Sequence, residues 1–165
     1  MAVRPSQLWK SLSIDRRQAL ADAFWRESAD EDAQAQHMEA TMALARRLNF
    51  RAKSVQALPI ERRARHLAQL SDVSETVATR ALIAYHLGAQ RPLMAAFLDA
   101  LGIAHENGVI NSEEVPKPEA GRLATAVQTI RESFPADDVS LYLRTLEIID
   151  PGTWGEIHAL LPPSA

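Results

Sequence analysis

The residues of this chain that could do acid–base or metal chemistry are its histidines and the carboxylates near them. The histidines are His37, His66, His86, His105 and His158. Imidazole and carboxylate groups supply the lone pairs for proton transfer or metal binding when several of them converge on one point. No two histidines are four residues apart, and the sequence has neither an HExxH motif nor a Glu-x-x-His pair. We therefore expect no metal site and no cofactor.

Two histidines fall on apolar faces of predicted helices, and one falls in a glycine-bounded loop. His37 shares a face with Ala40 and Leu44, and His86 follows Leu82 by one helical turn. We expect both rings to lie in the core or at its edge, bonded to backbone carbonyl groups. The segment 102–108 brings His105 and Glu106 together between two glycines. An alternative function is therefore an enzyme or a small-ligand or metal-binding protein, with a site between helices at His86, His105 and Glu106.

Other catalytic arrangements are missing from the sequence. The chain has no cysteine, which excludes thiolate nucleophiles, zinc–thiolate sites and disulfides. It has no G-x-S-x-G turn, and its six glycines form neither of the usual phosphate-binding loops. Nothing in these patterns favours an enzyme.

The strongest polar signal is an uneven distribution of charge. Residues 46–65 contain seven basic side chains and one acid, whereas residues 99–165 contain eleven acids and four bases, a net charge of −7. Arginine forms bidentate contacts with carboxylates and phosphates. We expect this segment to bind a protein partner with an acidic surface. The partner-binding residues would be Arg46, Arg51, Arg62, Arg65 and His66.

Two other interpretations of the same basic segment stay open. The arginines could be solvated, or could pair with the acidic run 30–32 or with the acidic C-terminal third. They could also contact phosphate or nucleic acid. The whole chain, however, has a net charge of −3 and a pI of about 5.9, and dedicated nucleic-acid-binding domains are usually basic. Nucleic acid is therefore the less favoured partner.

The elements that would position these residues are all helical. Leu123, Val127, Ile130 and Phe134 follow a helical repeat without interruption, and similar stripes cover most of the chain. Capping signals include Asp150 before Pro151, Asp72 with Glu75, and glycines at 88, 102 and 108 that would end helices. The helices are predicted at 6–11, 14–27, 31–48, 60–70, 74–87, 92–104, 119–133, 137–149 and 152–161, with a turn or short helix in 50–57.

These elements predict an all-α fold with a single domain over 1–165 and a surface loop near 113–118. The eight or nine helices would form an irregular bundle or a short superhelical stack, with the apolar helix 74–87 at its centre. Segments 12–17 and 58–63 share four of six residues at an offset of 46, a spacing typical of helical solenoid repeats. Whether this is a true repeat stays open.

The composition is that of a globular protein, with 47% hydrophobic and 24% charged residues. Apolar runs such as Ala81 to Tyr85 and Leu93 to Leu98 are too short to span a membrane. The first residues contain no apolar stretch, so we expect no secretory signal, and the absence of cysteine fits the cytoplasm. We predict a non-enzymatic helical module for protein–protein interaction, as a monomer or a homodimer.

Overall fold

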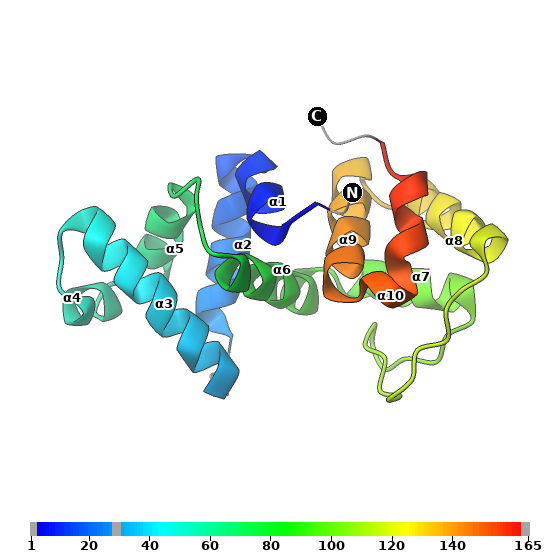
Figure 1. The fold of residues 1–165 in the computed structure, drawn as a ribbon, viewed down its shortest axis with the longest axis horizontal. Coiled ribbons are helices and arrows are strands. Elements are labelled where there is room, and N and C mark those ends of the chain that lie inside the picture. Colours follow the sequence, from blue (N-terminus) through cyan, green and yellow to red (C-terminus); the bar gives the residue numbers. More distant parts are fainter. Residues whose placement is uncertain (1–2, 28–30, 163–165) are drawn as a thin grey trace. The chain divides into compact units, whose positions relative to one another are not determined.

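The computed structural model describes residues 3–27 and 31–162, except for the side chain of residue 32. This part of the chain forms ten α-helices and one 3-10 helix and contains no strand, which confirms the predicted all-α class (Figure 1). The chain divides into two compact units. Residues 4–88 form one, called here the N-terminal unit, and the residues from Ala89 onward belong to the other, the C-terminal unit. The single domain over 1–165 stays a prediction.

The N-terminal unit contains six helices. They are α1 (Pro5–Ser11), α2 (Ile14–Arg26), α3 (Glu31–Leu48), α4 (Ala52–Gln56), α5 (Ile60–Ala68) and α6 (Glu75–Ala89). Helix α5 packs against α2 and α3, and α4 packs against α3. Segments 12–17 and 58–63 lead into α2 and α5, so the two similar sequences begin helices that contact each other. The repeat itself stays a prediction.

Helix α5 shows how the sequence dictates the packing of this unit. Ala64, Leu67 and Ala68 are buried, whereas Arg62 and Arg65 on the other side are exposed. Burying an unpaired guanidinium is strongly unfavourable, and burying a leucine side chain contributes about 2 kcal/mol. The apolar face therefore points toward α2; the spacing predicts that this face is buried but not which helix covers it.

Hydrogen bonds tie the first two helices to the second half of the unit. The Trp9 indole Nε1 donates to the Leu70 carbonyl oxygen at 2.8 Å, and Trp9 is fully buried. Arg16 Nη1 donates to the Tyr85 hydroxyl oxygen at 2.8 Å. Since these partners are more than 60 residues apart, such bonds fix α1 and α2 against the chain around α6 in a way that helix periodicity cannot specify.

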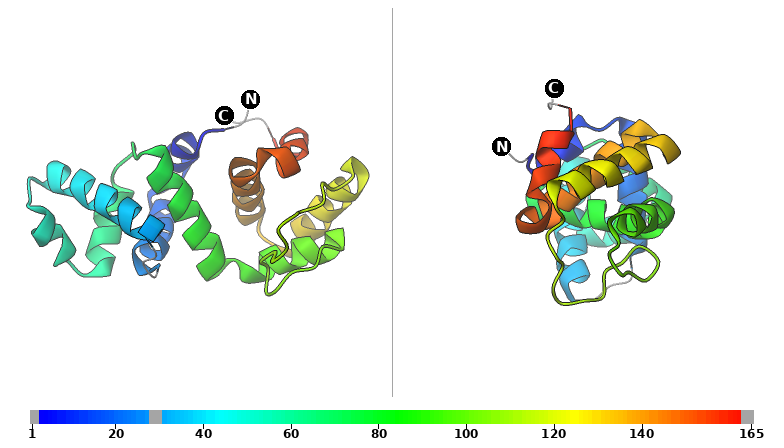
Figure 2. Two further views of the ribbon diagram at one scale, coloured as in Figure 1. Left: turned by 60° about the horizontal axis from the view of Figure 1, so that its bottom comes forward. Right: turned by 90° about the vertical axis from the view of Figure 1, so that its right-hand side faces the viewer.

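The C-terminal unit contains four α-helices and the 3-10 helix. They are α7 (Arg91–Leu101), α8 (Ala120–Ser133), α9 (Ala136–Ile149), α10 (Pro151–Trp154) and η1 (Gly155–Leu160). Its core forms around Phe97, whose ring centroid lies 5.6 Å from that of Tyr142 and 5.8 Å from that of Trp154. The chain between α7 and α8 is a long loop that includes the predicted loop near 113–118 (Figure 2).

Several predicted helix ends are confirmed and others are wrong. The Asp150 carboxylate accepts from the Thr153 amide at 3.2 Å, the predicted cap, and hydrogen bonds from the Thr153 side chain and amide lower the pKa of Asp150. Gly102 ends α7 with φ of +71°, three residues earlier than predicted. Gly88 lies inside α6, and Gly108 lies in the loop rather than at a helix end. The residue that caps α6 is Ser74, whose hydroxyl accepts from the Val77 amide at 3.2 Å.

Asp72 does not cap α6 because it faces Lys10, 3.4 Å away, and Glu75 does not complete a capping box because it binds α1. Phe24 and Trp25 are both buried although they are neighbours on α2, where adjacent side chains point in different directions. The Arg63 guanidinium covers Trp25, at 5.2 Å from its ring centroid.

Replacing Gly108 with alanine should destabilise the C-terminal unit by about 2 kcal/mol or more. Gly108 has φ of +86°, and an added Cβ would lie 2.8 Å from Met94 Cβ and 3.1 Å from the Arg91 carbonyl oxygen. Gly121→Ala is the matched control, because a Cβ there meets nothing within 4 Å and α8 gains about 0.5–1 kcal/mol. Urea unfolding measures both changes. Equal effects of the two substitutions would contradict the assigned loop geometry.

Glu75 should make the stability of the N-terminal unit sensitive to acid. Its carboxylate accepts from the Ser6 hydroxyl at 2.7 Å and the Ser6 amide at 2.9 Å, which lowers its pKa below the ordinary 4.5. A lowered folded-state pKa stabilises the fold above the unfolded-state value, and this contribution is lost as the pH falls through the folded-state value. Denaturant unfolding below pH 4.5 should therefore show a steeper loss of stability for the native chain than for Glu75→Gln. Parallel pH profiles would disprove this role.

Candidate functional site

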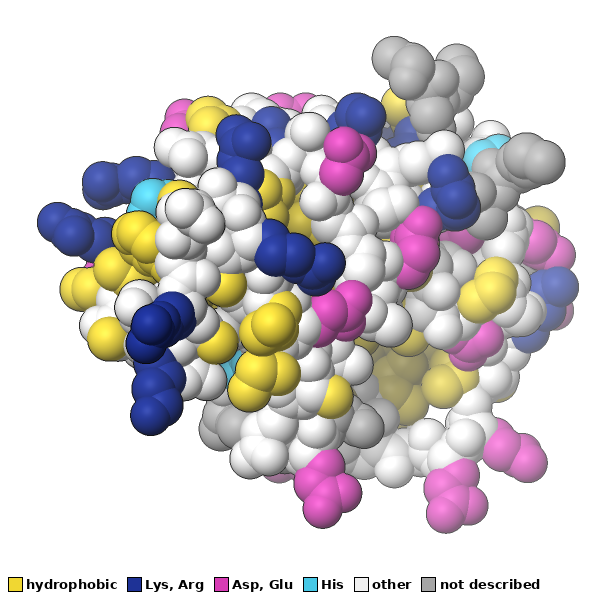
Figure 3. Space-filling model, turned by 60° about the vertical axis from the view of Figure 1, so that its left-hand side comes forward, with side chains coloured by type: hydrophobic (Ala, Val, Ile, Leu, Met, Phe, Trp, Pro, Cys, Tyr) yellow, Lys and Arg dark blue, Asp and Glu magenta, His cyan; other side chains and the backbone are white. Residues whose placement is uncertain are grey.

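The most distinctive surface of the N-terminal unit is formed by basic side chains from three helices. We call it the basic surface, and its members are all exposed: Arg46, Arg47, Arg51, Lys53, Arg62 and Arg65. The first two lie in the last turn of α3, where cations interact favourably with the helix dipole. In Figure 3 the side of the molecule that holds α3, α4 and α5 comes forward, and Lys and Arg side chains stand out around groups of hydrophobic side chains.

The six cations form no ion pair with any carboxylate in the described part of the chain. Asp30 and the side chain of Asp32, which we considered as partners, lie outside the described residues. The nearby Glu61 pairs instead with Arg26, at 3.1 Å. Arg46 donates from Nε to the Met42 carbonyl oxygen, at a long 3.4 Å.

Arg63, the seventh basic residue of segment 46–65, and the neighbouring His66 are less accessible than the six cations of the basic surface. Arg63 is half-buried, with its guanidinium over Trp25 and its Nε donating to the Leu58 carbonyl oxygen at 3.1 Å. His66, a predicted partner-binding residue, is half-buried, and its Nδ1 atom is buried without a hydrogen-bond partner among the described residues. The four predicted arginines are therefore exposed to solvent, whereas His66 is only partly exposed.

Large apolar side chains are exposed beside these cations. Met38 and Met42 on α3 are 49% and 45% exposed, and Phe50 after α3 is 48% exposed. Sequence reasoning did not select these residues. The sequence nevertheless indicates them. Met38 and Met42 are four residues apart and so share a helix face, and this face is not the apolar face of Ala40 and Leu44.

A pocket of about 200 Å³ lies next to the methionines. We call it the α3 pocket. Residues of α3, α5, α6 and the chain between α5 and α6 line it: Glu39, Ala40, Ala43, Arg46, Leu67, Asp72, Val73, Ser74 and Val77. It was not predicted, because it depends on how three helices meet rather than on any motif. Arg46 belongs both to its rim and to the basic surface.

The alternative site at His86, His105 and Glu106 has a different geometry. His105 Nε2 donates to Asp99 Oδ1 at 2.7 Å, and its Nδ1 accepts from the Gly108 amide at 3.0 Å. With both ring nitrogens engaged, the imidazole closes the loop after α7 and has no lone pair left for a substrate or metal. The Glu106 carboxylate accepts from Asn111 Nδ2 at 2.9 Å.

His86 belongs to the N-terminal unit, whereas His105 and Glu106 belong to the C-terminal unit. The structure therefore gives no geometry that joins the three residues. His86 is buried, and its Nδ1 bonds to the Leu82 carbonyl oxygen at 2.8 Å. His37 Nε2 bonds to the Phe24 carbonyl oxygen at 2.7 Å. Both rings thus lie in the core or at its edge and bind backbone carbonyls, as predicted.

Other titratable groups of the C-terminal unit do not assemble into a site. The exposed His158 lies 3.1 Å from the buried Glu147 carboxylate, measured from Nδ1 to Oε1. Burial raises the pKa of the Tyr142 hydroxyl well above its ordinary value, so the residue stays neutral. No group of three or more potential metal-ligating side chains occurs among the residues that the structure describes.

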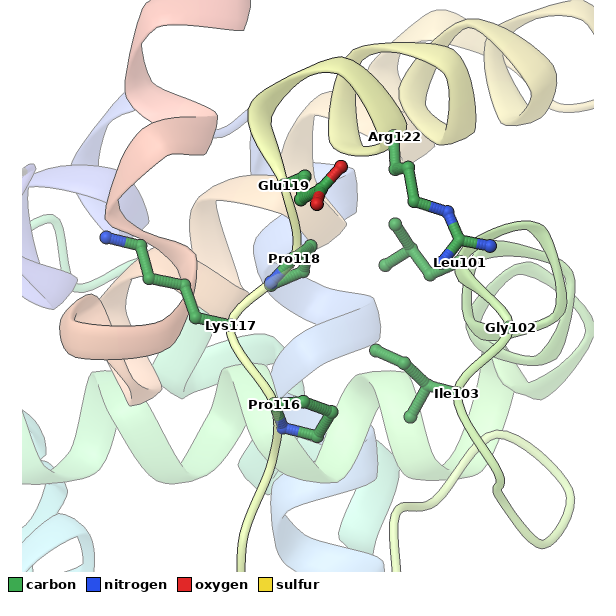
Figure 4. Close-up of a pocket in the computed structure, with 8 residues that line it drawn as sticks. All are labelled: Leu101, Gly102, Ile103, Pro116, Lys117, Pro118, Glu119 and Arg122. Atoms are coloured by element: carbon green, nitrogen blue, oxygen red, sulfur yellow. The ribbon is translucent and has the colours of Figure 1, made fainter.

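A second pocket, of about 240 Å³, lies between the end of α7 and the start of α8 (Figure 4). Leu101 and Ile103 point into it, whereas Lys117 turns away and pairs with Glu156 at 3.4 Å. Its remaining charged lining residues are Glu119 and Arg122. No histidine or hydroxyl side chain lines this pocket.

Comparison with known proteins gives no match: no family model, no curated protein and no solved structure is significantly similar to the chain. In the residues described by the structure, no helix is long and apolar enough to cross a membrane.

Replacing His105 with alanine should destabilise the C-terminal unit by about 1–3 kcal/mol, since two hydrogen bonds are lost. Glu106→Gln should have little effect, because an amide oxygen still accepts from Asn111. Thermal unfolding measures the stability, and native mass spectrometry measures bound species. A metal or small molecule that is bound to the native chain and lost from both variants would instead favour the alternative site.

Proposed function

We propose that the N-terminal unit is a non-enzymatic protein-interaction module that binds an acidic segment of another protein through the basic surface. One observation carries this proposal: the six exposed cations have no carboxylate partner among the described residues. Their mutual repulsion weakly destabilises the free surface, and a partner that supplies carboxylates would relieve it. The predicted residues Arg46, Arg51, Arg62 and Arg65 belong to this set.

The role of these cations is to attract and orient the partner. Exposed ion pairs contribute only about 0.2–1 kcal/mol each, so charge alone gives modest affinity. It raises the association rate and disfavours basic partners. Tight binding needs buried apolar contacts as well. The exposed Met38, Met42 and Phe50 offer such contacts.

The same apolar residues favour a protein partner over nucleic acid. A phosphate backbone would use the arginines but would leave the methionines in water. An acidic protein segment with apolar side chains suits both components of the surface.

Reversing the charge of Arg62 or Arg65 should weaken binding of an acidic peptide about five-fold. Each substitution removes an attraction and adds a repulsion, together about 1 kcal/mol. The probe is a fluorescein-labelled helical peptide with Leu on one face and Glu on the others, and anisotropy measures its affinity. Arg122→Glu is the control, because it makes the same charge change at an exposed position in the C-terminal unit.

Three results would overturn the proposal. The first is that the native chain shows no saturable binding of the peptide up to about 1 mM. The second is that Arg62→Glu and Arg65→Glu bind the peptide as Arg122→Glu does. The third is that a labelled DNA duplex binds more tightly than the peptide, with a steep salt dependence that the two substitutions reduce.

A further inference from the structure

We infer that the acidic partner segment is an amphipathic helix that lies along α3 and inserts an aliphatic side chain into the α3 pocket. This inference rests on the proposed function and adds the form of the partner and the position of its apolar contact. Four features of the structure support it: the floor of the pocket, the charges on its rim, the exposed methionines and the length of α3.

The floor of the pocket is apolar because small side chains leave space there. Ala40 and Ala43 of α3 face Leu67, Val73 and Val77 across it. Ala40, Leu67 and Val77 are buried, whereas Ala43 and Val73 are half-buried and thus accessible from outside. An aliphatic side chain placed here would meet carbon atoms on several sides, which contributes roughly 25 cal/mol per Å² of apolar surface buried.

Among the charged residues on the rim, Arg46 is the one that can pair with an acidic ligand. The Glu39 carboxylate accepts from the Thr76 hydroxyl at 2.9 Å, and the Asp72 carboxylate lies 3.4 Å from Lys10 Nζ. Arg46 has no carboxylate partner among the described residues, since its Nε reaches only the Met42 carbonyl oxygen. The rim therefore presents one guanidinium to a ligand, while its acids already have partners of their own.

The exposed methionines extend the apolar contact beyond the pocket. Met42 follows Glu39 by three residues and precedes Arg46 by four, so the Met38–Met42 stripe runs along α3 beside these pocket residues. Methionine is flexible and polarizable, and it is common on surfaces that receive varied helices. The two residues are one helical turn apart, which matches the spacing of apolar side chains on an apposed helix.

The volume of the pocket and the length of α3 favour a helical ligand that inserts one side chain into the pocket. A pocket of about 200 Å³ is smaller than the roughly 300–1,000 Å³ of sites that enclose drug-sized ligands. Helix α3 has 18 residues and is about 27 Å long, which gives an apposed helix a long contact. The described residues offer no strand edge to which an extended peptide could add.

Filling the pocket tests the inference. Two labelled helical peptides with identical Glu residues are compared, one with Leu on its apolar face and one with Ala. The native chain should bind the Leu peptide about ten-fold more tightly, because a leucine buries more carbon than an alanine. In the Ala43→Leu variant, the ratio of the affinity for the Leu peptide to the affinity for the Ala peptide should fall toward one. The affinity for the Ala peptide itself should be unchanged. Ala100→Leu, at an exposed position of α7, is the control and should keep the ratio.

A second variant covers the case in which Ala43→Leu perturbs folding, as judged by circular dichroism. Met42→Ser changes an exposed side chain and should lower the Leu-to-Ala peptide ratio about three-fold. An unchanged ratio in both variants, or no preference for Leu in the native chain, overturns the inference. These results leave the proposed function intact if Arg62→Glu and Arg65→Glu still weaken both peptides. Failure of the native chain to bind either peptide overturns both proposals.

Discussion

The packing of α5 against α2 is the constraint on which the N-terminal unit and its basic surface depend. A helix of nine residues has one face to bury, and here that face consists of Ala64, Leu67 and Ala68. The guanidinium groups on the opposite face cannot follow them into an apolar core without carboxylate partners. The packing that buries this apolar face therefore also exposes Arg62 and Arg65 to water.

The cations of α3 and α4 add to the charge for a different reason. Arg46 and Arg47 stand at the C-terminal end of α3, where they are favourable to the helix, and Arg51 precedes α4 directly. No carboxylate among the described residues pairs with these cations. Glu61 forms an ion pair with Arg26 instead, and Glu39 accepts a hydrogen bond from Thr76. The surface therefore retains a net positive charge in a chain whose total charge is −3.

The sequence predicts local structure well and tertiary structure poorly, and particular residues show why. The helix repeats and the Asp150 cap depend on neighbours a few residues away, and they are confirmed. The assignment of Asp72 as a cap failed because Lys10, 62 residues distant, pairs with it, and Ser74 caps the helix instead. For the candidate site, the arginine positions could be predicted from charge spacing. The α3 pocket could not, since Leu67 and Val77 reach it only through tertiary packing.

The most direct test of the central claim is an NMR titration of the isotope-labelled chain with the unlabelled acidic helical peptide. We expect amide shifts to cluster at residues 38–51 and 62–66, with a further group at the α3 pocket around Val73. Shifts confined to residues 89–162, or spread evenly over both units, would contradict the central claim and place binding elsewhere.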